Sequence, residues 1–298
     1  MTPARPETAR SETPNPQTPS PQTPSPQTPS SGPAHSEPPI LVVLGVNGVG
    51  VEVIRLVLGH GLDPTTLLAT QGWEVKRVLD VVSQGVEKQV LTMAFVVEAA
   101  EVIRLPLADP IGPERGLRQD GDLLVGEGEV PERRQRLSAH AFVTSSRGVL
   151  MTQFSDRTNA SGQWGPPGGG VEAGEAPDRA LMREAWEESG QVIEVSELAL
   201  VQTLHWIGRA PTGRLEDFHA VRLVYRALCH APTEPVVHDV GGTTASAAWV
   251  PQTDLDRLDV VASWRSLFSG VVMAPDEPDG PNHHEQQTGA HDRTRPQL

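Results

Sequence analysis

The sequence predicts a mixed α/β domain in its second half, preceded by a small α+β module and a disordered, Pro-rich N-terminus. Three observations predict this organisation. Strand-like apolar runs surround one amphipathic helix in the second half, a shorter group of apolar runs precedes them, and the first 37 residues are dominated by Pro, Thr, Ser and Gln.

The two ends of the chain have compositions typical of disorder. Residues 1–37 contain the repeat Pro-Gln-Thr-Pro-Ser between Pro16 and Ser30, and residues 274–298 are polar and rich in Pro and Gly. Segments with so little apolar surface cannot offset the entropy lost on folding, so we expect both tails to be disordered. His283, His284 and His291 in the second tail form no closed ligand set, and we expect them to bind no metal.

Residues 39–108 are interpreted as the small α+β module. We expect a strand at 40–44, a glycine-rich turn at 45–50, a helix at 51–58, and strands at 73–82 and 89–97. Strand, glycine turn and helix resemble a dinucleotide site, but the glycine spacing differs from G-x-G-x-x-G and the segment is too short for a doubly wound sheet. The sequence assigns no role to this module, and a structural or partner-binding appendage is the default. Residues 109–132 are acidic and rich in Gly and Pro, which predicts a linker.

The main domain is expected over residues 133–270. A hairpin is predicted from 139–144 and 148–154, strands at 198–206, 220–228 and 245–250, and a helix at 177–189. After the last strand, four apolar residues are spaced for one helical face: Leu255, Leu258, Val261 and Trp264.

The predicted helix at 177–189 has an apolar face and an acidic face. Pro177 suits a first helical turn, and Gly190 suits the left-handed residue that ends a helix. At 100° per residue the core-facing arc contains Leu181, Met182, Ala185 and Trp186, and the opposite arc contains Glu184, Glu187 and Glu188. Carboxylates at these spacings repel each other, and a hard divalent cation would offset that repulsion. Ligands that are all oxygen favour Mg²⁺ held together with substrate phosphates.

The stretch from Gly169 to Gly190 resembles the signature of the Nudix hydrolase family. That signature is Gly, five residues, Glu, seven residues, Arg-Glu, a small or apolar residue, any residue, Glu-Glu, any residue, Gly. Every spacing is present, and the preceding Trp164-Gly165-Pro166-Pro167-Gly168 is also similar to the family. One departure is Gln191, where the family usually has an aliphatic residue, with Val192 one position later.

The resemblance implies an α/β/α sandwich with a mixed sheet and a pyrophosphohydrolase that uses Mg²⁺, with Mn²⁺ as an alternative. It implies water attack on one phosphorus of a nucleoside diphosphate linked to another group. The carboxylate ligands carried over are Glu184, Glu187 and Glu188, with Gly168 as a backbone-carbonyl ligand. Four residues are expected to shape the motif rather than touch substrate: Gly169, Glu175, Arg183 and Gly190.

Residues outside the motif are candidates for the remaining roles. Glu216 is a candidate general base, as is the adjacent Asp217. The alternative is that the two residues have no catalytic role and lie at the end of an ordinary β-hairpin. Four residues are candidates for substrate binding, with core packing or free surface as the alternative: Trp206, Arg209, Arg214 and Phe218.

Composition limits the partners. The net charge of −14, without a basic stripe, argues against a nucleic-acid partner. A single cysteine excludes an internal disulfide framework and fits a reducing, cytoplasmic compartment, and no apolar run reaches membrane-spanning length. The N-terminus has no apolar segment typical of a secretory signal. A homodimer is left open.

The substrate is expected to be a small nucleotide. Nucleotide sugars, ADP-ribose, dinucleoside polyphosphates and modified nucleoside triphosphates all remain open, since loops outside the motif select among them. The alternative to an enzyme is a non-catalytic Nudix-fold module that senses a nucleotide. Such modules usually lack one of the motif glutamates, and this sequence keeps them all.

Overall fold

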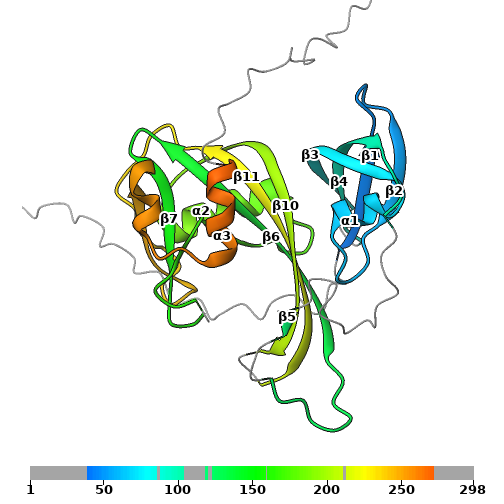
Figure 1. Ribbon diagram of the computed structural model, residues 1–298. Coiled ribbons are helices and arrows are strands. Elements are labelled where there is room, and N and C mark those ends of the chain that lie inside the picture. The colour runs from blue at the N-terminus through cyan, green and yellow to red at the C-terminus, as the bar shows by residue number, and fades with distance from the viewer. Residues whose placement is uncertain are drawn as a thin grey trace, which may run out of the picture. The chain divides into compact units, whose positions relative to one another are not determined.

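The computed structural model describes residues 39–85, 88–103, 118–119, 123–158, 160–210 and 213–271 (Figure 1). Both predicted tails therefore lie outside the described residues, as does half of the predicted linker. Within the described residues, no helix has both the length and the apolar character needed to cross a membrane.

The first group of elements is a four-stranded sheet with one short helix. It contains β1 (Ile40–Val46), β2 (Glu52–Val57), α1 (Pro64–Ala69), β3 (Trp73–Gln84) and β4 (Val90–Ala99). The strand order is β2-β1-β4-β3, with β1 and β4 parallel and the other pairs antiparallel. An α+β module is present here.

The helix predicted at 51–58 is wrong, because this segment is the strand β2. The Asn47 side chain accepts hydrogen bonds from the backbone N–H groups of Val49 and Val51, and Gly50 adopts φ 82°. These contacts reverse the chain and pair β2 with β1. The segment is also rich in β-branched residues, which favour a strand over a helix.

The second group of elements is an eight-stranded mixed sheet with two α-helices. Its strands are β5 (Arg118–Gln119), β6 (Glu132–Ser145), β7 (Gly148–Phe154), β8 (Trp164–Gly165), β9 (Gly168–Gly170), β10 (Glu194–Arg209), β11 (Leu215–Leu228) and β12 (Thr244–Val250). The order is β12-β7-β6-β11-β10-β5, with β8 paired to β7 and β9 to β6. The short β5 lies within the predicted linker and pairs with β10.

The helices α2 (Pro177–Ser189) and α3 (Ala262–Val271) cover opposite faces of this sheet (Figure 1). Ala141 and Val143 of β6 belong to the same buried cluster as Leu181 of α2, whereas Phe142 belongs to the cluster of Trp264 on α3. Because neighbouring strand residues point to opposite faces, this alternation produces the predicted α/β/α sandwich. Leu255 lies in a separate 3₁₀ helix, Gln252–Arg257, so the closing apolar residues span two helices.

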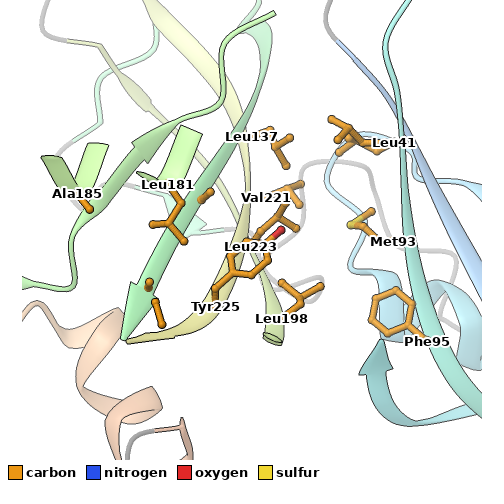
Figure 2. Packing of buried hydrophobic residues seen from close by; sticks show 14 of the residues in the cluster. Leu41, Met93, Phe95, Leu137, Leu181, Ala185, Leu198, Val221, Leu223 and Tyr225 are labelled. Carbon is orange, nitrogen blue, oxygen red and sulfur yellow. The ribbon is translucent and has the colours of Figure 1, made fainter. Parts of the chain in front are cut away.

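The larger buried cluster includes residues of both sheets. Figure 2 shows Val221, Leu223 and Tyr225 of β11 in this cluster, together with Leu181 of α2 and Met93 of β4. All five side chains are at most 5% exposed. Their burial, at about 25 cal/mol per Å² of apolar area, is the main force that holds β11 in place.

The departure from the family pattern at Gln191 is resolved by hydrogen bonding. Gln191 is only 1% exposed, and its amide group exchanges hydrogen bonds with the backbone N–H and the hydroxyl of Thr233 and with the Ser189 carbonyl. Val192 is 80% exposed, and the next buried apolar residue is Ile193. A bonded amide thus occupies the buried position after the helix.

Candidate active site

The helix α2 presents three glutamates on one face. It begins at Pro177 and ends at Gly190, which adopts φ 68°, as the sequence predicts. The helix buries Ala180, Leu181 and Ala185 in the core. The expectation that Glu188 lies on an arc opposite the core is wrong, because Glu188 is seven residues after Leu181, on nearly the same side of the helix, and is itself buried.

The expected core position of Trp186 is wrong. Its side chain is 50% exposed and stacks on His238, with ring centroids 4.4 Å apart. The backbone N–H of His238 donates to the Glu187 carbonyl at 2.7 Å, so the loop after β11 lies over the end of α2 and supplies this partner. Contacts with a distant loop cannot be derived from helical periodicity.

Glu188 is the most buried of the three carboxylates. Its side chain accepts hydrogen bonds from the backbone N–H of Gly168 at 2.9 Å and from the Thr244 hydroxyl at 2.6 Å. Burial raises the pKa of Glu188 to about 7, and the negative charges of Glu184 and Asp239 add to the increase against the effect of the two hydrogen bonds. The two hydrogen-bond donors to Glu188 are uncharged, so they do not neutralise the negative charge that Glu184, Glu188 and Asp239 bring to this site.

Arg183 organises the other acidic side chains. Its guanidinium makes a two-pronged contact with Glu175, with both N–O distances 3.0 Å, and donates to the Gly170 carbonyl at 3.0 Å. The same guanidinium donates to Glu184 at 2.9 Å and Glu187 at 3.2 Å. Planar bidentate pairing is specific to arginine, so Arg183 ties the loop at Glu175 to the helix and spaces two of the carboxylates.

The glycines of β9 allow α2 to approach the sheet. A Cβ atom at Gly169 would collide with the Glu184 carboxyl group, and one at Gly168 would collide with the Ala139 carbonyl. Gly168 also adopts φ 141°, which a residue with a side chain rarely adopts. The absence of side chains at these positions leaves room for the carboxylates beside the backbone of β9.

Two arginines at this end of the sheet did not emerge from the sequence. Arg222 of β11 lies opposite Ser138 of β6, which in turn pairs with Gly170. The Arg222 guanidinium donates to Gln202 and Ser263, each at 3.1 Å, and lies 4.7 Å from the Trp264 ring centroid. Burial lowers the pKa of Arg222 to about 10, and the charge of Arg136 contributes.

Arg136 is the second of these cations. Its guanidinium would lie 3.1 Å from a Cβ placed on Gly170, and its charge acts on Glu184. Among the residues described, neither Arg136 nor Arg222 forms an ion pair with a carboxylate. A sequence signal existed for Arg222, since it interrupts the apolar run from Ala220 to Val224. Asp239, near Glu188, lies in an irregular loop and had no such signal.

The other candidates from the sequence lie farther along the sheet. Glu216 is six residues from Arg222 on β11, about 20 Å at ~3.3 Å per residue. It contacts Arg214 at 3.2 Å and Arg134 at 3.9 Å. Arg209 makes a two-pronged contact with Glu129, at 2.8 and 2.7 Å.

The aromatic candidates pack against each other. Trp206 and Phe218 are register partners on β10 and β11, and their ring centroids are 4.4 Å apart. Glu216 and this pair therefore occupy the end of β11 away from α2. Arg209 and Arg214 at the same end both have carboxylate partners.

Comparisons with known proteins agree with this geometry. The family model described as "NUDIX domain" matches residues 134–268. The nucleoside triphosphatase NudI of Klebsiella pneumoniae (strain 342) is 30% identical over 128 residues, which cover 84% of that protein and 41% of this chain. The protein of the same description from Enterobacter sp. (strain 638) is 27% identical over 140 residues, covering 96% of that protein and 46% of this chain.

Among solved structures, the MutT NUDIX hydrolase from Burkholderia pseudomallei is similar to this chain. It is 28% identical and has a TM-score of 0.34, with coverage of 46% of this chain and 98% of the other. The family match and the NudI relatives coincide with a complete motif whose glutamates converge beside β9. The chain therefore belongs to the Nudix hydrolase family and is a pyrophosphohydrolase.

Proposed function

We propose that this enzyme hydrolyses a phosphoanhydride bond of a nucleoside triphosphate with the help of Mg²⁺. The observation that carries the substrate class is the pair of arginines without carboxylate partners: Arg136, whose charge acts on Glu184, and Arg222, which lies level with Gly170 two strands away. Guanidinium groups recognise phosphate oxygens, and several phosphates would be needed to reach both cations and the metal site. The description of the NudI relatives as nucleoside triphosphatases supports the same class.

The residues present fit a magnesium ion. Glu184, Glu187 and Glu188 offer only oxygen donors, and Glu188 is a buried carboxyl group with the negative charges of Glu184 and Asp239 nearby, which a cation would neutralise. The missing side chain at Gly169 leaves space next to the Glu184 carboxyl group. When bound, Mg²⁺ would lower the pKa of the attacking water and neutralise phosphate charge.

The protein groups would then supply binding, orientation and proton transfer. Arg136 and Arg222 hold the phosphates, while Arg183 keeps Glu184 and Glu187 in place. Glu187 is the most exposed of the three box carboxylates, with 35% of its side chain accessible, and is a candidate to accept the proton of the attacking water. Glu216 is the competing candidate outside the box.

The proposal predicts that Glu188→Gln lowers kcat by about 10²–10³, or roughly 3–4 kcal/mol of transition-state stabilisation, because a metal contact is lost. The assay follows pyrophosphate and nucleotide release with Mg²⁺ across nucleoside triphosphates, nucleotide sugars, ADP-ribose and dinucleoside polyphosphates. Glu194→Gln, an exposed carboxylate paired with His230, is the matched control and should keep full activity. Wild-type turnover that survives in Glu188→Gln would contradict the assignment.

The same assay decides the general base. Glu187→Gln and Glu216→Gln are compared at saturating Mg²⁺, and we expect the larger loss in kcat from Glu187→Gln because Glu216 lies at the far end of β11. The opposite order would assign the base to Glu216. Saturable nucleotide binding without any turnover would instead favour the sensing module.

The proposal also predicts that Arg222→Met raises KM for a nucleoside triphosphate by about 10–100-fold, since a charge-assisted contact of this kind contributes roughly 1.5–3 kcal/mol. Arg136→Met should act in the same direction, and because the Arg136 side chain is exposed, the substitution should leave the fold intact. Arg214→Met is the control, because Arg214 pairs with Glu132 and Glu216. Unchanged KM in both Arg222→Met and Arg136→Met would exclude the phosphate role.

A further inference from the structure

A second group of ligating side chains lies on β10 and β11, apart from the box glutamates. His205 of β10 is the register partner of His219 on β11, and Asp217 is two residues before His219. Because strand residues two apart share a face, these three side chains point to the same side of the sheet. His60, from the segment between β2 and α1, reaches this side and completes the group, which we call the His60 cluster.

The ligand atoms of three members of the His60 cluster, His60, His205 and Asp217, converge. The Nε2 atoms of His60 and His205 lie 3.0 and 2.6 Å from the same oxygen of Asp217. The candidate ligand atoms of these three residues all lie within 4.8 Å of one another. A tetrahedral ion with ~2.0 Å bonds needs ligand atoms about 3.3 Å apart, so small side-chain movements would admit it.

His219 is an independent sign of a missing ligand. Its side chain is 0% exposed, and neither ring nitrogen has a hydrogen-bond partner. Its ring centroid lies 5.4 Å from that of His60 and 6.1 Å from that of His205. A buried polar group without a partner is costly, and a bound ion would satisfy it.

The backbone next to His60 lies close to the His205 ring. Gly61 adopts φ 73°, and a Cβ on it would lie 2.6 Å from the His205 ring. Asp63 holds the same segment to β10, because its Oδ2 accepts a hydrogen bond from the Thr203 hydroxyl at 3.0 Å. Residues 60–63 are therefore held against the strand that carries His205.

We propose that His60, His205 and Asp217 bind a zinc ion, and that a movement of the His219 ring toward them would let it act as the fourth ligand. Two or three imidazoles with one carboxylate suit Zn²⁺, whereas Mg²⁺ prefers ligands that are all oxygen. One Asp217 oxygen lies within hydrogen-bond distance of both His60 and His205 and would be the carboxylate ligand. The other Asp217 oxygen lies 3.7 Å from the Arg133 side chain.

The zinc ion would have a structural role. Glu188 bonds to Gly168, which lies level with Val224 through His140 of β6, and Asp217 is seven residues from Val224 along β11, about 23 Å at ~3.3 Å per residue. This site is therefore separate from the box carboxylates. Its ligands come from the segment after β2 and from the strands β10 and β11. His60 and Asp217 are 157 residues apart in the sequence. The ion would cross-link these segments and would be independent of the proposed nucleotide chemistry.

The test is a Zn²⁺ titration of the full chain, stripped of metal and kept in excess Mg²⁺, followed by calorimetry. We expect wild type to bind about one more equivalent of Zn²⁺ than His60→Gln, and Asp217→Asn to weaken that site at least tenfold. His230→Gln is the matched control, since His230 also contacts a carboxylate, Glu194 at 2.6 Å, but stands outside the cluster. The box glutamates and the tail histidines are intact in every variant and cancel in the comparison.

Two outcomes would overturn the proposal. One is a Zn²⁺ isotherm that is unchanged in both His60→Gln and Asp217→Asn while the circular dichroism spectra match wild type. The other uses only wild type: substitution with Co²⁺ that gives the weak absorption of an octahedral ion rather than the strong visible bands of a tetrahedral one. Either result would mean that Asp217 only accepts two hydrogen bonds from neighbouring imidazoles.

Discussion

At the scale of single residues, the site depends on buried polar groups that have found partners. Glu188 is 6% exposed yet accepts hydrogen bonds from Gly168 and Thr244, and Gln191 is buried with its amide group bonded to Thr233. Burying a polar atom without a hydrogen-bond partner costs about 1–3 kcal/mol of stability, so each of these buried side chains needs the partner that the fold supplies. Gln191 shows that an amide can replace an aliphatic side chain when each of its polar atoms is bonded.

The exchange of Gln191 for leucine tests this reading. Gln191→Leu keeps the volume but leaves the Thr233 N–H without its acceptor, and we expect the free energy of unfolding to fall by about 1–3 kcal/mol. Urea denaturation measures the change. Val192→Thr, at an exposed neighbouring position, should stay within about 0.5 kcal/mol of wild type. Equal stability of Gln191→Leu and wild type would show that the hydrogen bonds contribute little.

At the scale of elements, the helix α2 was the most predictable part of the chain. Its bounds, its glutamate face and its left-handed end at Gly190 follow from local rules of helix spacing and capping. Both this helix and the segment 51–58 were predicted from local sequence preference alone. That preference was sufficient for α2, but it gave the wrong structure for 51–58. The turn at Asn47 and Gly50 pairs β2 with β1, and this pairing decided the structure of a segment whose short apolar pattern suits either state.

The helix end provides a second stability test. Gly190→Ala introduces a Cβ at φ 68°, only 2.9 Å from the His238 ring, and we expect a loss of about 1–2 kcal/mol in unfolding free energy. Gly48→Ala is the control, because that glycine lacks a positive φ and its Cβ would meet no atom within 4 Å. Thermal unfolding of the two variants should separate them by several degrees, and a shared midpoint would refute the strain argument.

At the scale of the whole molecule, a residue far away in sequence supports the loop next to the box glutamates. The Gln89 side chain, 6% exposed, accepts from the Gly174 N–H at 3.1 Å and donates to the Glu175 carbonyl at 2.8 Å. Glu175 in turn pairs with Arg183, which contacts Glu184 and Glu187. A residue just before β4 therefore supports the loop that positions the box carboxylates.

This support should be measurable in solution. Gln89→Ala removes both contacts, so we expect faster hydrogen exchange at the Gly174 amide and a loss of about 1–3 kcal/mol in unfolding free energy. Gln71→Ala, at an exposed position where the amide makes one long contact of 3.4 Å, should change neither quantity. If the hydrogen-exchange rate of the Gly174 amide were the same in Gln89→Ala as in wild type, the loop at Gly174 and Glu175 would keep its shape without help from residues 39–103.

The sequence by itself determined the family, the sandwich implied by it, and the helix with its three glutamates. These features depend on spacings within about twenty residues, where helical periodicity and glycine conformation act locally. The tertiary structure alone decided that Arg136 lies beside Gly170 of the box, that Glu216 lies at the far end of β11, and that His60 meets Asp217. Strand register and loop docking bring such residues together across more than a hundred positions, and no local preference records that pairing.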